Sequence, residues 1–265
     1  MYTSKERQDY FNKVINLFKD LSVVGIVQIG SGVTGYYDEY SDIDLMVAVP
    51  KPIDKYVNDI YEVLKQMGAN FIHEGKFGDE IFLLIPFFEN GLEMDISIMP
   101  VDLLSVKSPL WKVIYDPQKK VEGKLYELDK IFRENKQPYR ITPNIKFQYF
   151  YLLRKSLIEL KRNNLIGALS HTHLMKEFIL EIQILKENKK LHQFKRYQDL
   201  DEGFQMKYLS TYEIANNKKE IEKKLIEITN LFLEVYSSLY KIPLNSYADE
   251  YMAFFGNDDL IKGGI

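Results

Sequence analysis

The chain has 265 residues, enough for one large domain or two modest ones with buried cores. It has no cysteine, which excludes disulfides and zinc–thiolate sites, and no apolar run reaches the roughly 18 residues of a membrane-spanning helix. The net charge of −3 argues against non-specific duplex binding, which needs a basic face. The polar N-terminus is unlike a secretory signal, so the expected location is the cytoplasm.

Helix, strand and turn alternate over the first fifty residues. Thr3 or Ser4 can cap a helix whose apolar residues recur at helical spacing, namely Phe11, Val14, Ile15 and Phe18. An apolar strand is predicted over Val23–Ile29, followed by a glycine- and serine-containing turn over Gly30–Gly35. A second apolar strand is predicted over Ile43–Val49.

Two aspartates open this second strand. Asp42 and Asp44 are one residue apart, and side chains at i and i+2 of a strand point to the same face. Two like charges held so close repel unless a cation lies between them. Because ligand sets made only of oxygen suit Mg²⁺ better than a soft metal, Asp42 and Asp44 are predicted to bind Mg²⁺.

The turn before the aspartates is suited to binding phosphate. Gly30 and Ser31 supply backbone N–H groups and a hydroxyl, which together can hold phosphate oxygens. An Asp-x-Asp by itself is common in solvated turns and helix caps, and a Gly-Ser pair is a weaker signal still. The ordered combination of strand, Gly-Ser turn and acidic strand indicates nucleotide chemistry instead.

A third acid follows about fifty residues later. The segment Gly91–Met99 alternates like a strand and places Asp95 on the same face as Glu93. If this strand lies beside that of Asp42 and Asp44, three carboxylates converge, enough for one or two Mg²⁺ ions. Asp95 is then either a further metal ligand or the general base that accepts a proton from an acceptor hydroxyl. The residues leave both roles open.

The other elements of the first half are shorter or less regular. Two strands are predicted over Ala69–His73 and Glu80–Pro86, and a strand segment over Val113–Tyr115. Helices are predicted around two apolar stripes, which comprise Ile53, Val57, Ile60 and Leu64, and Leu125, Leu128, Ile131 and Phe132.

The hydrophobic pattern of the sequence changes after a linker at Lys136–Pro143. This linker contains two prolines and no regular spacing of apolar residues. Long helices are predicted over Ile145–Arg162, Gly167–Lys186 and Ile221–Tyr240. We therefore predict an α+β protein, with a small mixed sheet in residues 1–141 and an all-helical bundle in residues 142–265. The active site is expected between the two, where ligand sites preferentially form.

The ordered motif resembles the signature of the polymerase-beta-type nucleotidyltransferase superfamily, which has Gly-Ser, a downstream glycine (Gly35), an Asp-x-Asp strand and a later strand carboxylate. Within it, the chain most resembles bacterial aminoglycoside (streptomycin) 6-adenylyltransferases. The resemblance extends to Phe87–Pro100, to Lys112–Pro117, and to Tyr240–Leu244 with Tyr251–Phe255. The chain departs from that family's Asn-Pro-rich loop and aromatic-Asp-Tyr-Asp strand.

The resemblance implies a nucleotidyltransferase catalytic domain whose substrate cleft is completed by the helical bundle. It implies Mg²⁺-dependent transfer of a nucleoside monophosphate, expected to be AMP from ATP, to a hydroxyl of a small molecule, expected to be an aminoglycoside-type antibiotic. Lys195 and Arg196 begin a basic patch that the resemblance assigns to the triphosphate. A solvated helix end is the alternative explanation of this patch.

The charge balance bears on the acceptor. Residues 1–141 carry 17 lysines and arginines against 22 aspartates and glutamates, a balance of −5 that could attract a cationic acceptor. Variation of this size is also ordinary for protein surfaces. Other acceptors, such as a lincosamide, a protein or nucleic acid, remain open, as does a non-catalytic nucleotide-binding relative. Such relatives typically lose the acidic set that is kept here, and a polymerase would need basic stripes.

Overall fold

The computed structural model describes residues 2–35, 40–134, 142–189, 196–213 and 217–243. The chain divides into two compact units, Met1–Pro138 and Tyr139–Ile265. The boundary expected after Ile141 falls in residues 135–141, outside the described residues, and so does the C-terminal segment Tyr251–Phe255.

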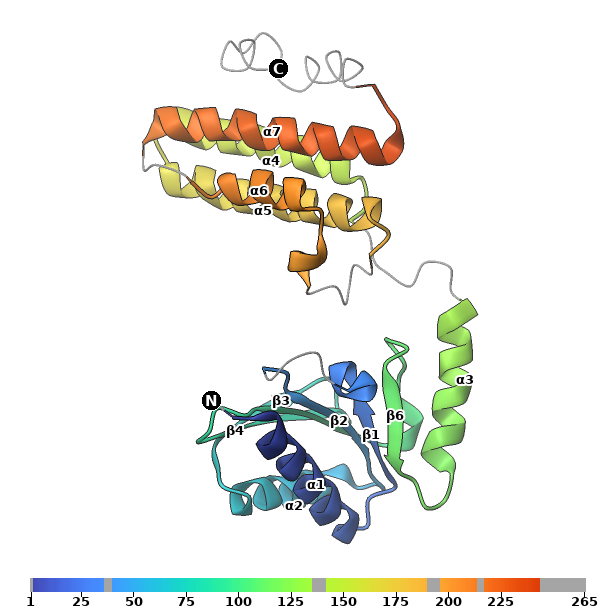
Figure 1. The fold of residues 1–265 in the computed structure, drawn as a ribbon. Helices are drawn as coiled ribbons and strands as arrows, with labels where there is room; N and C mark the ends of the chain where they lie inside the picture. Colours follow the sequence, from blue (N-terminus) through green and yellow to red (C-terminus); the bar gives the residue numbers. More distant parts are fainter. Residues whose placement is uncertain (1, 36–39, 135–141, 190–195, 214–216, 244–265) are drawn as a thin grey trace. The chain divides into compact units, whose positions relative to one another are not determined.

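The first unit contains a six-stranded sheet of order β3-β4-β5-β2-β1-β6, in which β2 and β5 are parallel and the other neighbours antiparallel (Figure 1). This confirms the predicted mixed sheet. Its strands are β1 (Gly25–Ile29), β2 (Ile43–Ala48), β3 (Ala69–Lys76), β4 (Phe82–Phe88), β5 (Met94–Met99) and β6 (Trp111–Tyr115). Its helices are α1 (Ser4–Asp20), α2 (Ile53–Gln66) and α3 (Lys120–Glu134), with short 3₁₀ turns η1 (Gly30–Thr34) and η2 (Val101–Leu103).

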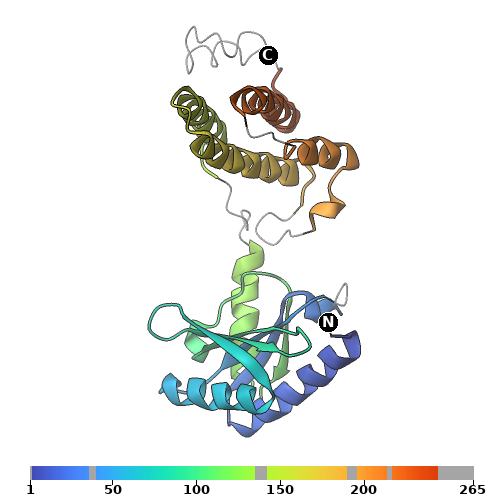
Figure 2. The ribbon, with the colours of Figure 1, turned by 90° about the vertical axis from the view of Figure 1, so that its left-hand side faces the viewer.

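Helices cover both faces of this sheet. The apolar stripes of α1 and α2 pack on one face, and Figures 1 and 2 show the two helices side by side there. On the other face, Val121 and Leu125 of α3 join Val27, Met46 and Ala48 in a second apolar cluster. Alternate residues of the central strands β1 and β2 therefore enter two different cores, which explains why both strands read as continuous apolar runs.

The N-terminus of α1 begins as its sequence predicts. Thr3 accepts a hydrogen bond from the Glu6 amide at 3.2 Å, and the Glu6 carboxylate accepts one from the Thr3 amide at 2.7 Å. This reciprocal capping box satisfies amide groups that otherwise lack a partner in the first turn of a helix.

Element bounds match the predictions or differ from them by up to three residues. Most of these differences affect only the frayed ends of elements. The start of β2 matters more, because the strand begins at Ile43, whose partner is Met94, the first residue of β5. Asp42 was predicted to lie on the strand with Asp44, and it lies immediately before the strand instead.

The second unit is helical throughout its described residues, as predicted for the C-terminal half. Helices α4 (Ile145–Lys161), α5 (Leu165–Lys186), α6 (Glu202–Ser210) and α7 (Lys218–Tyr240) enclose one apolar core. At its centre the rings of Tyr149 and Phe232 stack with centroids 3.6 Å apart. None of the helices that the structure describes is long and apolar enough to cross a membrane.

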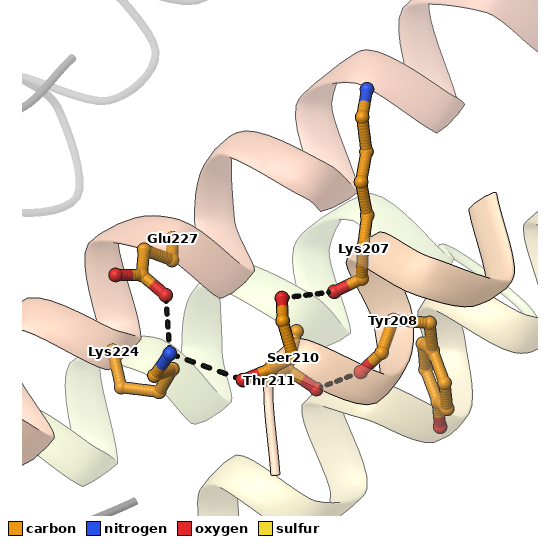
Figure 3. A network of polar contacts seen from close by, with 6 residues as sticks. All are labelled: Lys207, Tyr208, Ser210, Thr211, Lys224 and Glu227. Carbon is orange, nitrogen blue, oxygen red and sulfur yellow. Dashed lines mark hydrogen bonds and ion pairs between the residues drawn. The ribbon is translucent and has the colours of Figure 1, made fainter. Parts of the chain in front are cut away.

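A polar network closes the end of α6 and ties it to α7 (Figure 3). The hydroxyls of Ser210 and Thr211 donate to the carbonyls of Lys207 and Tyr208 at 2.7 and 2.6 Å. Lys224 of α7 donates to the carbonyl of Ser210 at 3.1 Å. Carbonyls at a helix C-terminus lack intrahelical donors, and these contacts supply them.

Candidate active site

Asp44 and Asp95 occupy partner positions in the parallel pair β2–β5. Neighbouring strands lie about 4.8 Å apart, and partner residues point to the same face, so the two carboxylates leave the sheet side by side. Both residues are half-buried, and the Oδ1 atom of Asp95 is fully buried. The predicted adjacency of the two acidic strands is therefore confirmed.

The carboxylates mark the point where an apolar row ends. Further along the same face, Met46 and Ala48 of β2 and Met99 of β5 are buried against α3. Placing two acids at the start of largely apolar strands costs free energy through desolvation and mutual repulsion. Such a cost is typical of a site that binds a cation.

Gly30 brings the turn η1 into contact with Asp44. Gly30 has φ +72°, and a Cβ atom added there would lie 2.3 Å from Oδ2 of Asp44. Real Cβ atoms are essentially never found at that distance, so a side chain at position 30 would displace the Asp44 carboxylate. The sequence motif of Gly-Ser and a later aspartate is thus a single cluster in space.

The backbone N–H of Gly30 has a different partner from the one predicted. Its N–H was expected to be available to phosphate, and it donates instead to the carbonyl of Leu110 at 3.1 Å. Gly30 therefore acts through its lack of a side chain. Within this turn, Ser31 is the first residue whose polar groups could meet a phosphate; it is half-buried, and its carbonyl accepts a hydrogen bond from the Thr34 hydroxyl at 3.3 Å.

Asp42 is half-buried and is held through its neighbour. The carbonyl of Ser41 accepts hydrogen bonds from the Tyr2 hydroxyl at 2.9 Å and from Nη1 of Arg7 at 3.1 Å. Neither Tyr2 nor Arg7 was selected from the sequence, because more than thirty residues separate them from Ser41 and neither belongs to the motif. The position of Arg7 relative to the apolar stripe of α1 does not predict this contact either.

The expected convergence of three carboxylates is met only in part. Across the described ranges, no group of three or more His, Asp or Glu side chains is placed to hold a metal ion. Strand pairing fixes Asp44 and Asp95 together, whereas Asp42 lies outside the paired segment and is not held by the ladder. Like charges also repel, which disfavours a closer approach.

Mg²⁺ still fits the chemistry of these donors. Asp42, Asp44 and Asp95 offer only oxygen ligands, and Mg²⁺ in proteins usually takes one or two carboxylates, with substrate phosphates and water completing its octahedral shell. The Gly30 approach leaves Asp44 in contact with the turn expected to hold those phosphates. A pair of carboxylates beside a phosphate turn therefore suffices for such a site.

The structure describes only one of the two basic residues that were predicted to bind the triphosphate. Lys195 lies outside the described residues. Arg196 precedes a short 3₁₀ turn, η3 (Tyr197–Asp199), and its Nε lies 2.9 Å from Oδ2 of Asp199, with the arginine side chain half exposed. This local ion pair matches the alternative of a solvated helix end, and a role for Arg196 at the triphosphate stays a prediction.

The match to a protein family decides how this geometry is classified. The sequence model of the nucleotidyltransferase domain matches residues 11–147, more than half of the chain. The chain belongs to this family. The matched range contains β1 to β6, the Gly30–Ser31 turn and all three candidate carboxylates. A search of curated protein sequences found no match.

Solved structures with similar folds include several nucleotidyltransferases. An aminoglycoside 6-adenyltransferase from Bacillus subtilis is 14% identical, covers 97% of this chain and 100% of its own, and has a TM-score of 0.40. A nucleotidyltransferase-like protein from Exiguobacterium sibiricum is 12% identical, covers 94% and 84%, and has a TM-score of 0.35. The Cid1 poly(U) polymerase with Mg and 3′-dATP bound is 16% identical, covers 88% and 67%, and has a TM-score of 0.34.

Proposed function

We propose that this nucleotidyltransferase transfers a nucleoside monophosphate, AMP from ATP in the first instance, to a hydroxyl of a small cationic acceptor of the aminoglycoside type. The observation that carries the proposal is the register of Asp44 opposite Asp95, with Gly30 in contact with the Asp44 carboxylate. That arrangement groups two acids and a phosphate-type turn in a member of a nucleotidyltransferase family.

Each residue has a role in the proposed reaction. Asp42 and Asp44 would hold Mg²⁺, with Asp95 as a further ligand. Bound Mg²⁺ would offset the negative charge that develops on the α-phosphoryl oxygens. The Ser31 hydroxyl would donate to the outer phosphates. The acceptor oxygen attacks the α-phosphorus, the bond to the bridging oxygen breaks, and pyrophosphate leaves.

The acceptor hydroxyl must lose its proton in this step. Asp95 is the candidate base, because a carboxylate within hydrogen-bond reach of the acceptor hydroxyl can accept its proton. The same oxygen atoms could instead serve as metal ligands. Metal titration of Asp95→Asn separates the two roles, because loss of a ligand weakens metal binding whereas loss of a base lowers turnover with the metal still bound.

The nature of the acceptor rests on two features of the sequence. One is the resemblance to aminoglycoside 6-adenylyltransferases, and the other is the acidic balance of residues 1–141, which favours a polyamine. The helical unit would complete the acceptor site. With such an acceptor, the enzyme would inactivate the antibiotic and confer resistance.

A two-way screen tests the proposal. The full chain is incubated with Mg²⁺ and each of labelled ATP, GTP, CTP and UTP, against a panel of aminoglycosides, lincosamides, protein and oligonucleotide. Label transferred to an aminoglycoside and lost in Asp44→Asn supports the proposal. Transfer to a lincosamide, protein or nucleic acid would replace the proposed acceptor. Nucleotide binding with no transfer to any acceptor would identify a non-catalytic relative and overturn the proposed reaction.

A further inference from the structure

Two buried side chains from the start of the chain converge on one backbone carbonyl. The Tyr2 hydroxyl and Nη1 of Arg7 both donate to the carbonyl of Ser41, at 2.9 and 3.1 Å. Tyr2 is 6% exposed and Arg7 is 3% exposed. Tyr2 lies 39 positions before Ser41 in the sequence, and Arg7 lies 34 positions before it.

The position of this carbonyl matters because Ser41 immediately precedes Asp42. A carbonyl oxygen has two lone pairs, so two donors occupy its full capacity and fix its direction. The peptide group is planar and includes the amide nitrogen and Cα of the next residue. Fixing the Ser41 carbonyl therefore fixes the Cα of Asp42 and limits the directions in which its carboxylate can point.

Tyr2 lies within electrostatic reach of Asp42. Burial raises the pKa of Tyr2, the Arg7 guanidinium opposes that rise, and the charges of Asp42 and Glu93 add to it. Arg7 brings a positive charge to the Ser41 carbonyl, next to the aspartate that strand pairing does not hold. A guanidinium is the side chain best suited to this task, since it stays charged and donates in fixed directions.

The location of Arg7 is costly for α1 itself. The other buried residues of this helix are Val14, Ile15 and Phe18, all apolar. An apolar side chain in place of Arg7 would avoid the desolvation of a charged group. The cost is explained if the arginine is needed for the geometry of the Ser41–Asp42 peptide.

We propose that Tyr2 and Arg7 are positioning residues, which aim the Asp42 carboxylate toward the pair formed by Asp44 and Asp95. The inference rests on the proposed function, because it gives Asp42 a role at the metal. It assigns to α1 a part in the site beyond its packing on the sheet.

The test uses Mn²⁺ as the probe, with its binding to the full chain followed by electron paramagnetic resonance in the presence of a non-hydrolysable ATP analogue. Tyr2→Phe removes one donor and keeps the ring in the core. Loss of one hydrogen bond is expected to weaken Mn²⁺ binding about fivefold. Arg7→Met should weaken it further, and Arg7→Lys should restore part of the affinity because it keeps the charge.

Thr3→Ala is the matched control. It removes the N-cap of the same helix, at a cost of about 1 kcal/mol, and does not touch Ser41. Thr3→Ala should lower the stability of α1 and leave Mn²⁺ affinity unchanged. If it weakens Mn²⁺ binding as much as Tyr2→Phe does, the effect comes from helix stability and the positioning role is wrong.

A double-mutant cycle with Asp42→Asn completes the design. Tyr2→Phe should have no further effect on Mn²⁺ binding once Asp42 is neutral, since it acts through that carboxylate. An undiminished effect in the Asp42→Asn background overturns the inference, as does wild-type affinity in both Tyr2→Phe and Arg7→Met. Wild-type protein that binds neither Mn²⁺ nor nucleotide overturns the proposed function, and this inference with it.

Discussion

Asp44 of β2 and Asp95 of β5 are partners across the parallel strand pair of the sheet, with the Gly30 backbone in contact with the Asp44 carboxylate. Fold stability alone does not favour this arrangement, because two half-buried acids on neighbouring strands repel. A bound cation would reverse the sign of that interaction. The following predictions are built on this cluster, on the turn beside it and on one buried lysine of the helical unit.

Neutralising the acidic pair should abolish activity without harming the fold. Asp44→Asn is expected to lower nucleotide transfer at least about 100-fold, because the charge that binds the metal is lost. Without Mg²⁺, its melting temperature should equal or exceed that of the wild type, since a like-charge repulsion is removed. Asp59→Asn, a change on the partly exposed surface of α2, is the control and should alter neither quantity. Near-wild-type turnover of Asp44→Asn would show the metal assignment to be wrong.

Gly30→Ala tests the close approach of the turn to Asp44. The new Cβ can be accommodated only by moving the Asp44 carboxylate, the flexible end of a side chain. We expect a large loss of turnover, with a loss of stability of only about 1 kcal/mol from the left-handed backbone. Gly78→Ala is a matched control, since Gly78 has the same φ of +72° and open space around its Cα.

Enzyme assays and urea unfolding of the two glycine variants separate the effect of backbone strain from the effect of displacing the Asp44 carboxylate. Gly78→Ala should lose similar stability and keep its activity. Equal activity of the two variants would mean that the contact between Gly30 and Asp44 has no functional importance.

Ser31→Ala should weaken triphosphate binding by about three- to tenfold, because one hydroxyl contact is lost. Isothermal titration calorimetry with a non-hydrolysable nucleotide measures this. Thr34→Ala removes the hydroxyl that bonds the Ser31 carbonyl and serves as the control for the shape of the turn. If the two variants lose the same affinity, the turn geometry is responsible and the Ser31 hydroxyl makes no direct contact.

The KM for a cationic acceptor should depend on salt. Exposed carboxylates attract a polyamine through charge, and the Debye length falls from about 10 Å at 0.1 M to about 3 Å at 1 M salt. The acceptor KM is expected to rise several-fold between these concentrations, with sucrose of equal osmolality as the control. A KM that does not respond to NaCl would contradict charge-based recognition by residues 1–141.

Lys176 of α5 makes the stability of the helical unit depend on pH. Its side chain is buried, with Nζ 3.6 Å from the centroid of the Tyr212 ring, and burial together with the charge of Lys224 lowers its pKa to about 8. The folded state therefore releases this proton near pH 8, whereas the unfolded chain keeps it to about pH 10.4. Stability from this group is lost as the pH falls through 8 and is gained as the pH rises above it.

Lys176→Met is accordingly expected to stabilise the protein at pH 7, by about 1–3 kcal/mol. The difference from wild type should shrink as the pH rises from 7 to 9.5, which urea unfolding at several pH values measures. Lys207→Met is the control, since the exposed Lys207 pairs with Glu234 and should show no such trend. A difference that stays constant with pH would mean that Lys176 is not the titrating group.

The sequence determines the local parts of this protein. Hydrophobic periodicity predicts α1, α2 and the long helices α4, α5 and α7, because the apolar residues of a buried helix face recur every three to four positions. The Gly-Ser turn and the acidic residues are recognisable for the same reason, since their spacing along the chain is short. The mixed sheet followed by helices follows from that order of elements, and the nucleotidyltransferase family follows from the resemblance of the motif to that family's signature.

Only the tertiary structure decides which distant residues meet. Pairing of β2 with β5 sets Asp44 opposite Asp95 and leaves Asp42 outside the ladder. The Gly30 amide donates to the carbonyl of Leu110, eighty residues away, and the Ser41 carbonyl accepts from Tyr2, which precedes α1, and from Arg7 within α1. Such contacts depend on strand register and on the docking of helices, which are set by the sum of many packing interactions. No local pattern encodes them, so the sequence names the acids of the site and the fold determines how they are held.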